Sequence, residues 1–169
     1  MFQKLHHVAY RCRDAAETVD FYTKAIGMEF SAALVQEAVP SLGLPEPHTH
    51  IFFEMKDGSH LAFFEILGST DRLTPVDNDW AQHIALEVES DAVAEEVAAR
   101  LRDRGVEVIG AVQHGEMARS WYFYDPSGHR MEMTVRAETE GPIWKALKAS
   151  AYDDLERWKV RKEQGLVPA

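Results

Sequence analysis

Two histidines stand at matching places in the two halves of the chain. His7 begins the run His7-Val8-Ala9, and His83 begins the run His83-Ile84-Ala85. A single histidine in an apolar run is commonly a core residue with a hydrogen-bond partner. Two at equivalent positions of a repeat would be brought close together by the symmetry of that repeat. The sequence therefore predicts that His7 and His83 act together.

Two glutamates interrupt the last apolar segment of each half. Glu65 lies within Phe63-Phe64-Glu65-Ile66, and Glu132 lies within Met131-Glu132-Met133. A carboxylate among apolar neighbours is costly to bury unless it is paired or bound to a metal. Two histidines with one or two carboxylates match the nitrogen and oxygen donors of a catalytic divalent-metal site. We therefore expect a metal centre built from both halves.

The helices and strands that position these residues are predicted in the same order in both halves of the chain. In the first half, Asp14 and Glu17 form a capping box at the start of a helix, and Gly27 ends that helix. In the second half, Val93, Val97 and Leu101 mark a helix face that Gly105 closes. Strands are predicted over 5–12, 28–35, 51–55 and 61–67 in the first half and over 82–88, 106–112, 120–124 and 130–135 in the second, with a proline-rich loop at 40–48 and a turn at 125–128.

Both halves therefore read as strand, helix and three strands, which predicts an α+β fold of two βαβββ modules. The first module spans about 3–67 and the second about 80–137, so that 1–137 form one domain. Residues 138–169 form a helical extension outside the repeat.

The extension carries an apolar stripe with helical spacing. Trp144, Leu147, Ala151, Leu155 and Trp158 follow one another in steps of 3, 4, 4 and 3 residues. Because exposed tryptophans make an adhesive patch, we expect the stripe to be buried, on its own domain or in a homodimer contact. A lid over a pocket is the alternative role.

Composition excludes several classes of protein. Among 169 residues, 28 acidic side chains exceed 18 basic ones, which leaves a net charge of −10 and argues against a general nucleic-acid binder. Apolar runs fall short of the roughly 18–20 residues that span a membrane. The N-terminal residues lack the layout of a secretory signal, and the single cysteine, Cys12, suits a reducing compartment, so a cytoplasmic protein is expected.

Several longer motifs resemble a known superfamily. The chain is similar to the vicinal oxygen chelate proteins, which include glyoxalase I, methylmalonyl-CoA epimerase, bleomycin-resistance proteins and type I extradiol dioxygenases. The resemblance covers about residues 3–136 and implies a fold of two βαβββ modules, curved around a metal cavity, with His7, His83 and Glu132 as ligands. The motifs that carry it are Leu5-His6-His7-Val8-Ala9, the run from Asp20 to Met28, Gln82-His83-Ile84-Ala85-Leu86 and the run from Tyr124 to Glu132.

Two branches of the superfamily imply different chemistry. Glyoxalase I and the epimerases have a fourth ligand where Glu65 stands. The extradiol dioxygenases use two histidines and one glutamate, and their signature adds a histidine and a tyrosine that His114 and Tyr122 match, although Trp121 departs from it. Six positions surround an octahedral ion, and a catecholate with dioxygen needs three of them, so a directly bound Glu65 would exclude this oxygen chemistry.

The sequence thus favours an extradiol-type ring-cleaving dioxygenase of an aromatic, catechol-like substrate. Iron(II) is the favoured metal, while Mn(II), Ni(II) and Zn(II) also suit the donors. His114 and Tyr122 are expected to donate hydrogen bonds to substrate and oxygen, His60 to shuttle a proton, and Glu65 to lie beside the metal without binding it. The alternatives are a glyoxalase-like or epimerase-like isomerase in which Glu65 is a ligand or base, and a metal-free drug-binding protein of the bleomycin-resistance type.

Overall fold

The computed structural model describes residues 2–69, 79–137 and 140–165, and two modules with the same order of elements make up most of it. The elements of the first module are β1 (His7–Arg11), α1 (Ala15–Asp20) with its π-helical continuation η1 (Phe21–Ile26), β2 (Glu29–Gln36), β3 (His48–Glu54) and β4 (His60–Ile66). Those of the second, after the short helix η2 (Asp79–Ala81), are β5 (Ile84–Glu87), α2 (Asp91–Asp103), β6 (Ile109–His114), β7 (Ala118–Tyr124) and β8 (Arg130–Arg136), and α3 (Glu140–Glu163) follows them.

Each module forms its own four-stranded mixed sheet. The strand orders are β1-β4-β3-β2 and β5-β8-β7-β6, so that the first strand of each module pairs with its last strand. These two pairs are parallel, and the other strand pairs are antiparallel. The predicted α+β fold of two βαβββ modules with a C-terminal helix is confirmed.

Local sequence explains where the first helix begins and ends. The Asp14 carboxylate accepts a hydrogen bond from the Glu17 amide at 2.7 Å, as a helix N-cap does. The Glu17 carboxylate, expected to reach back to the cap, instead pairs with Arg13. Gly27 ends η1 with a φ of 90°, a conformation that glycine adopts without steric cost.

The second helix buries a slightly different face from the predicted one. Its buried residues are Ala94, Val97, Ala98 and Leu101, whereas Val93 lies at the exposed margin. Spacings of three and four residues place these four side chains on one stripe against the sheet. The Trp121 indole nitrogen of β7 donates to Glu95 at 2.8 Å, which joins the helix to the strand beneath it.

Two predicted strand starts differ from the structure by three residues. The strand predicted over 106–112 begins at Ile109, because the Val106 amide bonds the Leu101 carbonyl and closes the preceding helix. Strand β3 begins at His48, three residues before the predicted start, and its first residues pair with β4. The prolines before His48 led to the prediction of a loop there. In the structure, β3 pairs with β2 and β4 from His48 onward.

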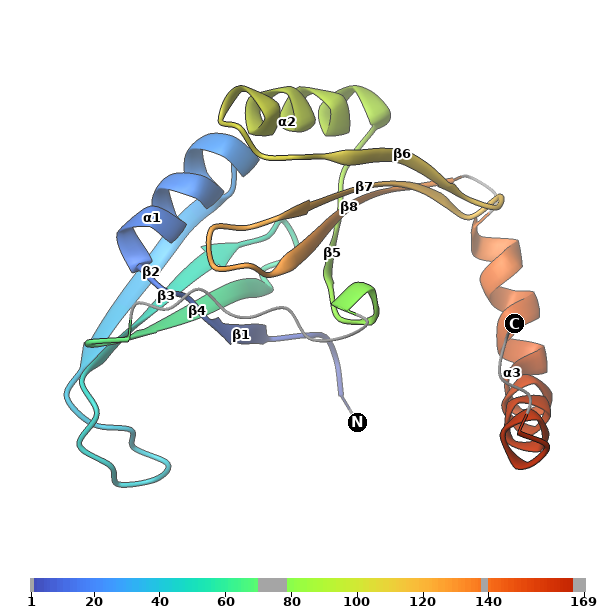
Figure 1. The fold of residues 1–169 in the computed structure, drawn as a ribbon, viewed down its shortest axis with the longest axis horizontal. Coiled ribbons are helices and arrows are strands. Elements are labelled where there is room, and N and C mark those ends of the chain that lie inside the picture. Colours follow the sequence, from blue (N-terminus) through green and yellow to red (C-terminus); the bar gives the residue numbers. More distant parts are fainter. Residues whose placement is uncertain (1, 70–78, 138–139, 166–169) are drawn as a thin grey trace.

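A buried junction holds the two modules together. The Tyr22 hydroxyl donates to Asp125 at 3.1 Å, and both residues are almost completely shielded from solvent. Burial raises the pKa of the Asp125 carboxyl. Arg100 of α2 donates to the Ala25 carbonyl at the end of η1, and the two helices lie side by side (Figure 1). Over the residues that the structure describes, α1 and α2 cover one face of each sheet and no helix covers the opposite face.

Helix α3 extends away from both modules (Figure 1). Within the helix, Arg157 pairs with Asp154 and Lys159 pairs with Glu156. The large apolar side chains of its predicted stripe are exposed in this single copy. No helix in the described ranges has the length and apolar character needed to cross a membrane.

We expect Tyr22→Phe to lower the free energy of unfolding by about 1–3 kcal/mol, because it leaves the buried Asp125 carboxylate without one of its donors. Urea unfolding followed by circular dichroism measures this change. Tyr152→Phe is the matched control, since Tyr152 is 88% exposed and its loss of a hydroxyl should change stability by less than about 0.5 kcal/mol. Equal effects of the two substitutions would contradict the structural role of the Tyr22 bond.

Candidate metal centre

His83 and Glu132 meet on the face of the second sheet that α2 does not cover. His83 directly precedes β5, and its Nε2 lies 2.9 Å from Oε2 of Glu132 in β8. Parallel pairing of β5 with β8 places Ala85 opposite Glu132 and so brings the start of β5 to the centre of β8. The structure thus joins two of the three predicted ligands.

The Glu132 carboxylate is held in a defined orientation. The hydroxyl of Ser120, a fully buried residue of β7, donates to its Oε1 at 2.5 Å. Only Oε2 therefore faces His83. A buried carboxylate that is fixed through one oxygen and presents the other is typical of metal ligands with supporting hydrogen bonds.

The ring of His83 is also oriented for binding a cation. Its Nδ1 lies 3.1 Å from the Trp80 carbonyl, which can only accept a hydrogen bond, so the proton of the neutral ring is assigned to Nδ1. Nε2 faces the Glu132 carboxylate at 2.9 Å, where a protonated ring donates a hydrogen bond and a neutral ring with its proton on Nδ1 offers a lone pair to a cation. A divalent cation between them would be bound by both, so this pair of donors fits a metal ion.

His114 and Tyr122 form a pair beside these residues. The Tyr122 hydroxyl and His114 Nε2 are in hydrogen-bond contact at 2.8 Å. Tyr122 pairs with Glu132 in register, and its ring meets the His83 ring edge to face at 6.3 Å between centroids. Burial and the neighbouring Glu132 carboxylate raise the pKa of the Tyr122 hydroxyl. Four predicted site residues, His83, His114, Tyr122 and Glu132, are therefore gathered on one sheet face.

His7 and His60 lie together on the first sheet. They face each other in the parallel register of β1 and β4. Nδ1 of His7 is 2.7 Å from Nδ1 of His6, so this nitrogen is occupied and Nε2 remains for another partner. This sheet face thus contains two of the predicted residues.

Sequence reasoning missed His48 and His50 on this same face. The His50 ring stacks on Phe64 at 3.7 Å and lies 5.9 Å from the His7 ring. Its Nε2 is buried without a hydrogen-bond partner, and burial, with smaller contributions from His7 and His48, lowers the pKa of His50 to about 4. The alternation of His48, His50 and Phe52 is the signal that could have found them once the strand is extended to His48.

Glu65 lies on the opposite face of the first sheet, which corrects the expectation that it approaches the metal. Its Oε2 accepts a hydrogen bond from the Ala15 amide at 2.7 Å and so caps the start of α1. It shares this face with Leu61 and Phe63, which are buried in the core. In register, the position equivalent to Glu132 is Ala62, because Leu61 pairs with Val8 as Met131 pairs with Ile84.

A complete centre does not form within the described part of one chain. Over these residues, no group of three or more His, Cys, Asp or Glu side chains could hold a metal ion. His83 and Glu132 make a half-site of two donors on the second sheet, and His7 lies on the first sheet. That the three converge on one ion stays a prediction.

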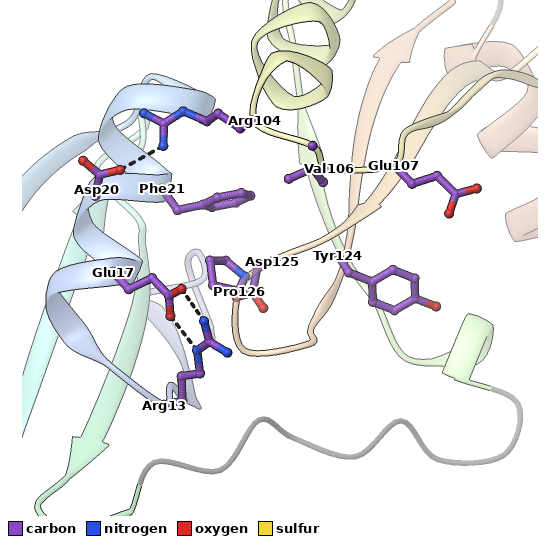
Figure 2. A pocket seen from close by; sticks show the side chains of 11 residues that line it. Arg13, Glu17, Asp20, Phe21, Arg104, Val106, Glu107, Tyr124, Asp125 and Pro126 are labelled. Atoms are coloured by element: carbon purple, nitrogen blue, oxygen red, sulfur yellow. Dashed lines mark hydrogen bonds and ion pairs between the residues drawn. The ribbon is translucent and has the colours of Figure 1, made fainter.

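A separate cavity of about 560 Å³ lies at the junction between the modules (Figure 2). Two ion pairs, Arg13 with Glu17 and Arg104 with Asp20, cross its wall beside Phe21 and Pro126. None of the predicted site residues lines this cavity. Four of its charged side chains are paired with each other in this way, and the candidate site lies elsewhere.

Comparison with known proteins gives consistent matches. The family model of the Glyoxalase/Bleomycin resistance protein/Dioxygenase superfamily matches residues 4–133. A 2-epi-5-epi-valiolone epimerase of an Actinomyces species is 32% identical over 169 residues, covering 91% of this chain and 90% of that protein.

Solved structures share the fold at lower identity. A glyoxylase/bleomycin resistance protein/dioxygenase domain from Frankia is 16% identical with a TM-score of 0.64, covering 80% of this chain and 99% of that one. The fosfomycin resistance protein FosX from Listeria monocytogenes, in complex with Mn(II) and sulfate, is 24% identical with a TM-score of 0.57, covering 83% of this chain and 98% of that one.

The low pKa of His50 makes stability depend on pH. The ring stays neutral in the folded state down to about pH 4 but binds a proton below about 6.5 in the unfolded state. The unfolded state therefore binds more protons between these values, and the free energy of unfolding should fall as pH decreases from 6.5 toward 4. His50→Gln should flatten this slope, measured by urea unfolding across the range with pH above 6.5 as the baseline. An unchanged slope would contradict the buried, neutral state of the ring.

Proposed function

Since the chain belongs to the Glyoxalase/Bleomycin resistance protein/Dioxygenase superfamily, we propose that it is a divalent-metal-dependent isomerase that epimerises a carbon beside the carbonyl group of a valiolone-like ketone. The observation that carries this proposal is the convergence of His83 Nε2 and Glu132 Oε2. The 32% identity to an epimerase over most of both chains supports the reaction class.

In this proposal His83 and Glu132 hold the metal. A bound divalent ion would polarise the carbonyl oxygen and so make the neighbouring C–H bond more acidic. Imidazole and carboxylate donors suit Mn(II), Fe(II), Ni(II) or Zn(II). Epimerisation transfers protons without oxidation or reduction of the metal, so the reaction class does not require iron.

The third ligand in this proposal is His7 of a second copy of the chain. Each copy carries one two-donor half-site, on the second sheet, and one further histidine, on the first sheet. In a two-fold symmetric dimer, the first sheet of one copy can face the second sheet of the other, which completes two identical centres. This arrangement is supported by the separation of the donors, because two of them lie on the second sheet and the third lies on the first sheet.

Polar side chains on the open faces of the two sheets could remove and return the proton on the carbon beside the substrate carbonyl. The His114–Tyr122 pair, in contact at 2.8 Å and adjacent to Glu132, is placed to exchange a proton with substrate on the second sheet. His60 lies opposite His7 on the first sheet. With the two sheets facing each other, groups on both sides of the substrate can remove and return a proton, which inversion of a carbon centre requires.

A second candidate function, the extradiol-type dioxygenase expected from the sequence, is supported by two observations. His114 and Tyr122 lie together beside Glu132, close enough to donate hydrogen bonds to a catecholate and oxygen held there. Placement of Glu65 away from the sheet face with His7 leaves three protein ligands, which also suits this chemistry. The epimerase relative favours the isomerase over this alternative.

Metal binding can be tested with a matched pair of substitutions. Glu132→Gln removes a charged donor and should weaken Mn(II) or Zn(II) affinity at least about 100-fold. Glu65→Gln makes the same chemical change in the other strand glutamate, which caps α1, and should leave metal affinity within about twofold. Isothermal titration of the metal-free proteins measures both. Equal loss in the two variants, or none in Glu132→Gln, would overturn the assignment of Glu132.

The reaction class can be tested by solvent exchange. In D₂O without oxygen, the metal-loaded protein should incorporate deuterium at the carbon beside the carbonyl of a valiolone-like ketone and yield the epimer, detected by NMR. Removal of the metal with a chelator should abolish the exchange. Oxygen uptake by the iron-loaded protein with simple catechols, without any exchange, would replace the isomerase by the dioxygenase.

A further inference from the structure

Arg130 adds a positive charge to the face of the second sheet that carries the candidate metal centre. It lies two residues before Glu132 in β8, and side chains two residues apart in a strand point to the same face of the sheet. Parallel pairing of Ile84 with Met131 places the residues that precede them, His83 and Arg130, next to each other. The charge therefore lies among the residues that hold the metal in the proposed function.

Tyr122 holds the Arg130 side chain against this face. The guanidinium carbon of Arg130 lies 4.8 Å from the centre of the Tyr122 ring, which is within the range of a cation–π interaction. The same ring meets the His83 ring, and its hydroxyl contacts His114. Arg130 is thus joined to the residues already gathered around Glu132, and its charge is part of the same surface.

Arg130 has no carboxylate partner within the described ranges, although the chain is acidic. Its side chain is half-buried, and its Nε is buried without a hydrogen-bond partner among the described residues. A charged donor is costly to bury when it lacks an acceptor. Most other described arginines form ion pairs with aspartate or glutamate, namely Arg13, Arg100, Arg102, Arg104, Arg119, Arg136 and Arg157. An anionic ligand on this face would supply the acceptor that Arg130 lacks.

The spacing along β8 lets one small ligand reach both the metal and Arg130. Residues two apart in an extended strand are about 6–7 Å apart. A ketone whose carbonyl oxygen lies at His83 and Glu132 could therefore place a group a few bonds away at the Arg130 guanidinium. The parallel N–H groups of arginine match two oxygens of a phosphate or a carboxylate, whereas a neutral hydroxyl leaves the positive charge uncompensated.

We propose that Arg130 binds a phosphate or carboxylate group of the substrate, so that the substrate is a ketone that carries an oxyanion. This inference rests on the proposed isomerase reaction and narrows its substrate to an anionic ketone. His83 and Glu132 lie at the carbonyl end of this ligand, and Arg130 lies at its anionic end. Fixing both ends of the ligand determines which carbon faces the His114–Tyr122 pair.

Three small hydroxy ketones that differ in one substituent test the proposal. Dihydroxyacetone is neutral, dihydroxyacetone phosphate carries a phosphate, and hydroxypyruvate carries a carboxylate. Their affinities for the full-length protein are measured by isothermal titration, both without metal and with Zn(II) bound. At least one of the anionic ketones should bind about tenfold or more tightly than dihydroxyacetone in both forms. The anion that binds more tightly identifies the group that Arg130 recognises.

Substitutions in one strand assign this preference to Arg130. Arg130→Met should abolish the preference for the anionic ketone, whereas Arg136→Met should leave it within about twofold. Arg136 is the matched control, because it lies in the same strand and already pairs with Glu87 at 2.9 Å. Equal affinity of the parent protein for all three ketones, or a preference that survives Arg130→Met, would overturn the proposal.

Arg130→Lys keeps the test decisive if the methionine variant does not fold. Lysine retains the charge but lacks the parallel N–H groups, so affinity for the anionic ketone should fall about threefold or more while affinity for dihydroxyacetone stays unchanged. Unchanged affinity for the anionic ketone would overturn the proposal. Thermal melting followed by circular dichroism establishes that each variant is folded.

Solvent exchange separates this inference from the proposed function. Deuterium exchange into a neutral valiolone-like ketone, without any preference for anionic ketones in the titrations, would overturn the role of Arg130 alone. A preference for anionic ketones that Arg130→Met abolishes, without exchange into any ketone, would overturn the isomerase reaction and leave Arg130 as the anion-binding residue.

Discussion

The bond between the Tyr22 hydroxyl and the buried Asp125 carboxylate is the constraint on which the arrangement of the molecule depends. It ties a helix of the first module to the β7–β8 turn of the second. Ser127 and His129 of that turn also bond the backbone of Arg13 and Arg11 at the end of β1. With the helices packed against each other at this junction, the sheets have one face in the core and one face available for chemistry.

This arrangement explains why the side chains of the candidate site fall into two groups. Along every strand, side chains alternate between the core face and the open face. On the second sheet, Glu132 and Tyr122 alternate with buried residues such as Met131 and Trp121. On the first sheet, His7 and His60 share the open face with His50. Each open face carries only part of the candidate site. This suits an assembly in which the first sheet of one copy faces the second sheet of another.

Much of the architecture could be predicted from the sequence because periodicity and capping are local signals. Asp14 and Gly27 bound the first helix as expected, and the 125–128 turn joins β7 to β8. The role of Glu65 could not be predicted in this way. Its apolar neighbours resemble those of Glu132, but the two glutamates differ in strand register, which places one against a helix end and the other beside a histidine. His48 and His50 were hidden for a similar reason, because nearby prolines suggest a loop while tertiary pairing extends the strand. In the proposed centre, His7 reaches His83 and Glu132 through a second copy of the chain, and local patterns carry no information on such a contact.

Parallel pairing of the first and last strands has a consequence for how this chain acquires its structure during synthesis. Among the described strands, β1 pairs only with β4, and β5 pairs only with β8. A nascent module on the ribosome therefore cannot place its first strand until its final strand has emerged, and this distant contact bears the full loop-closure entropy of the module. The histidine that begins each module is thus among the first residues of that module to be translated and among the last to be positioned.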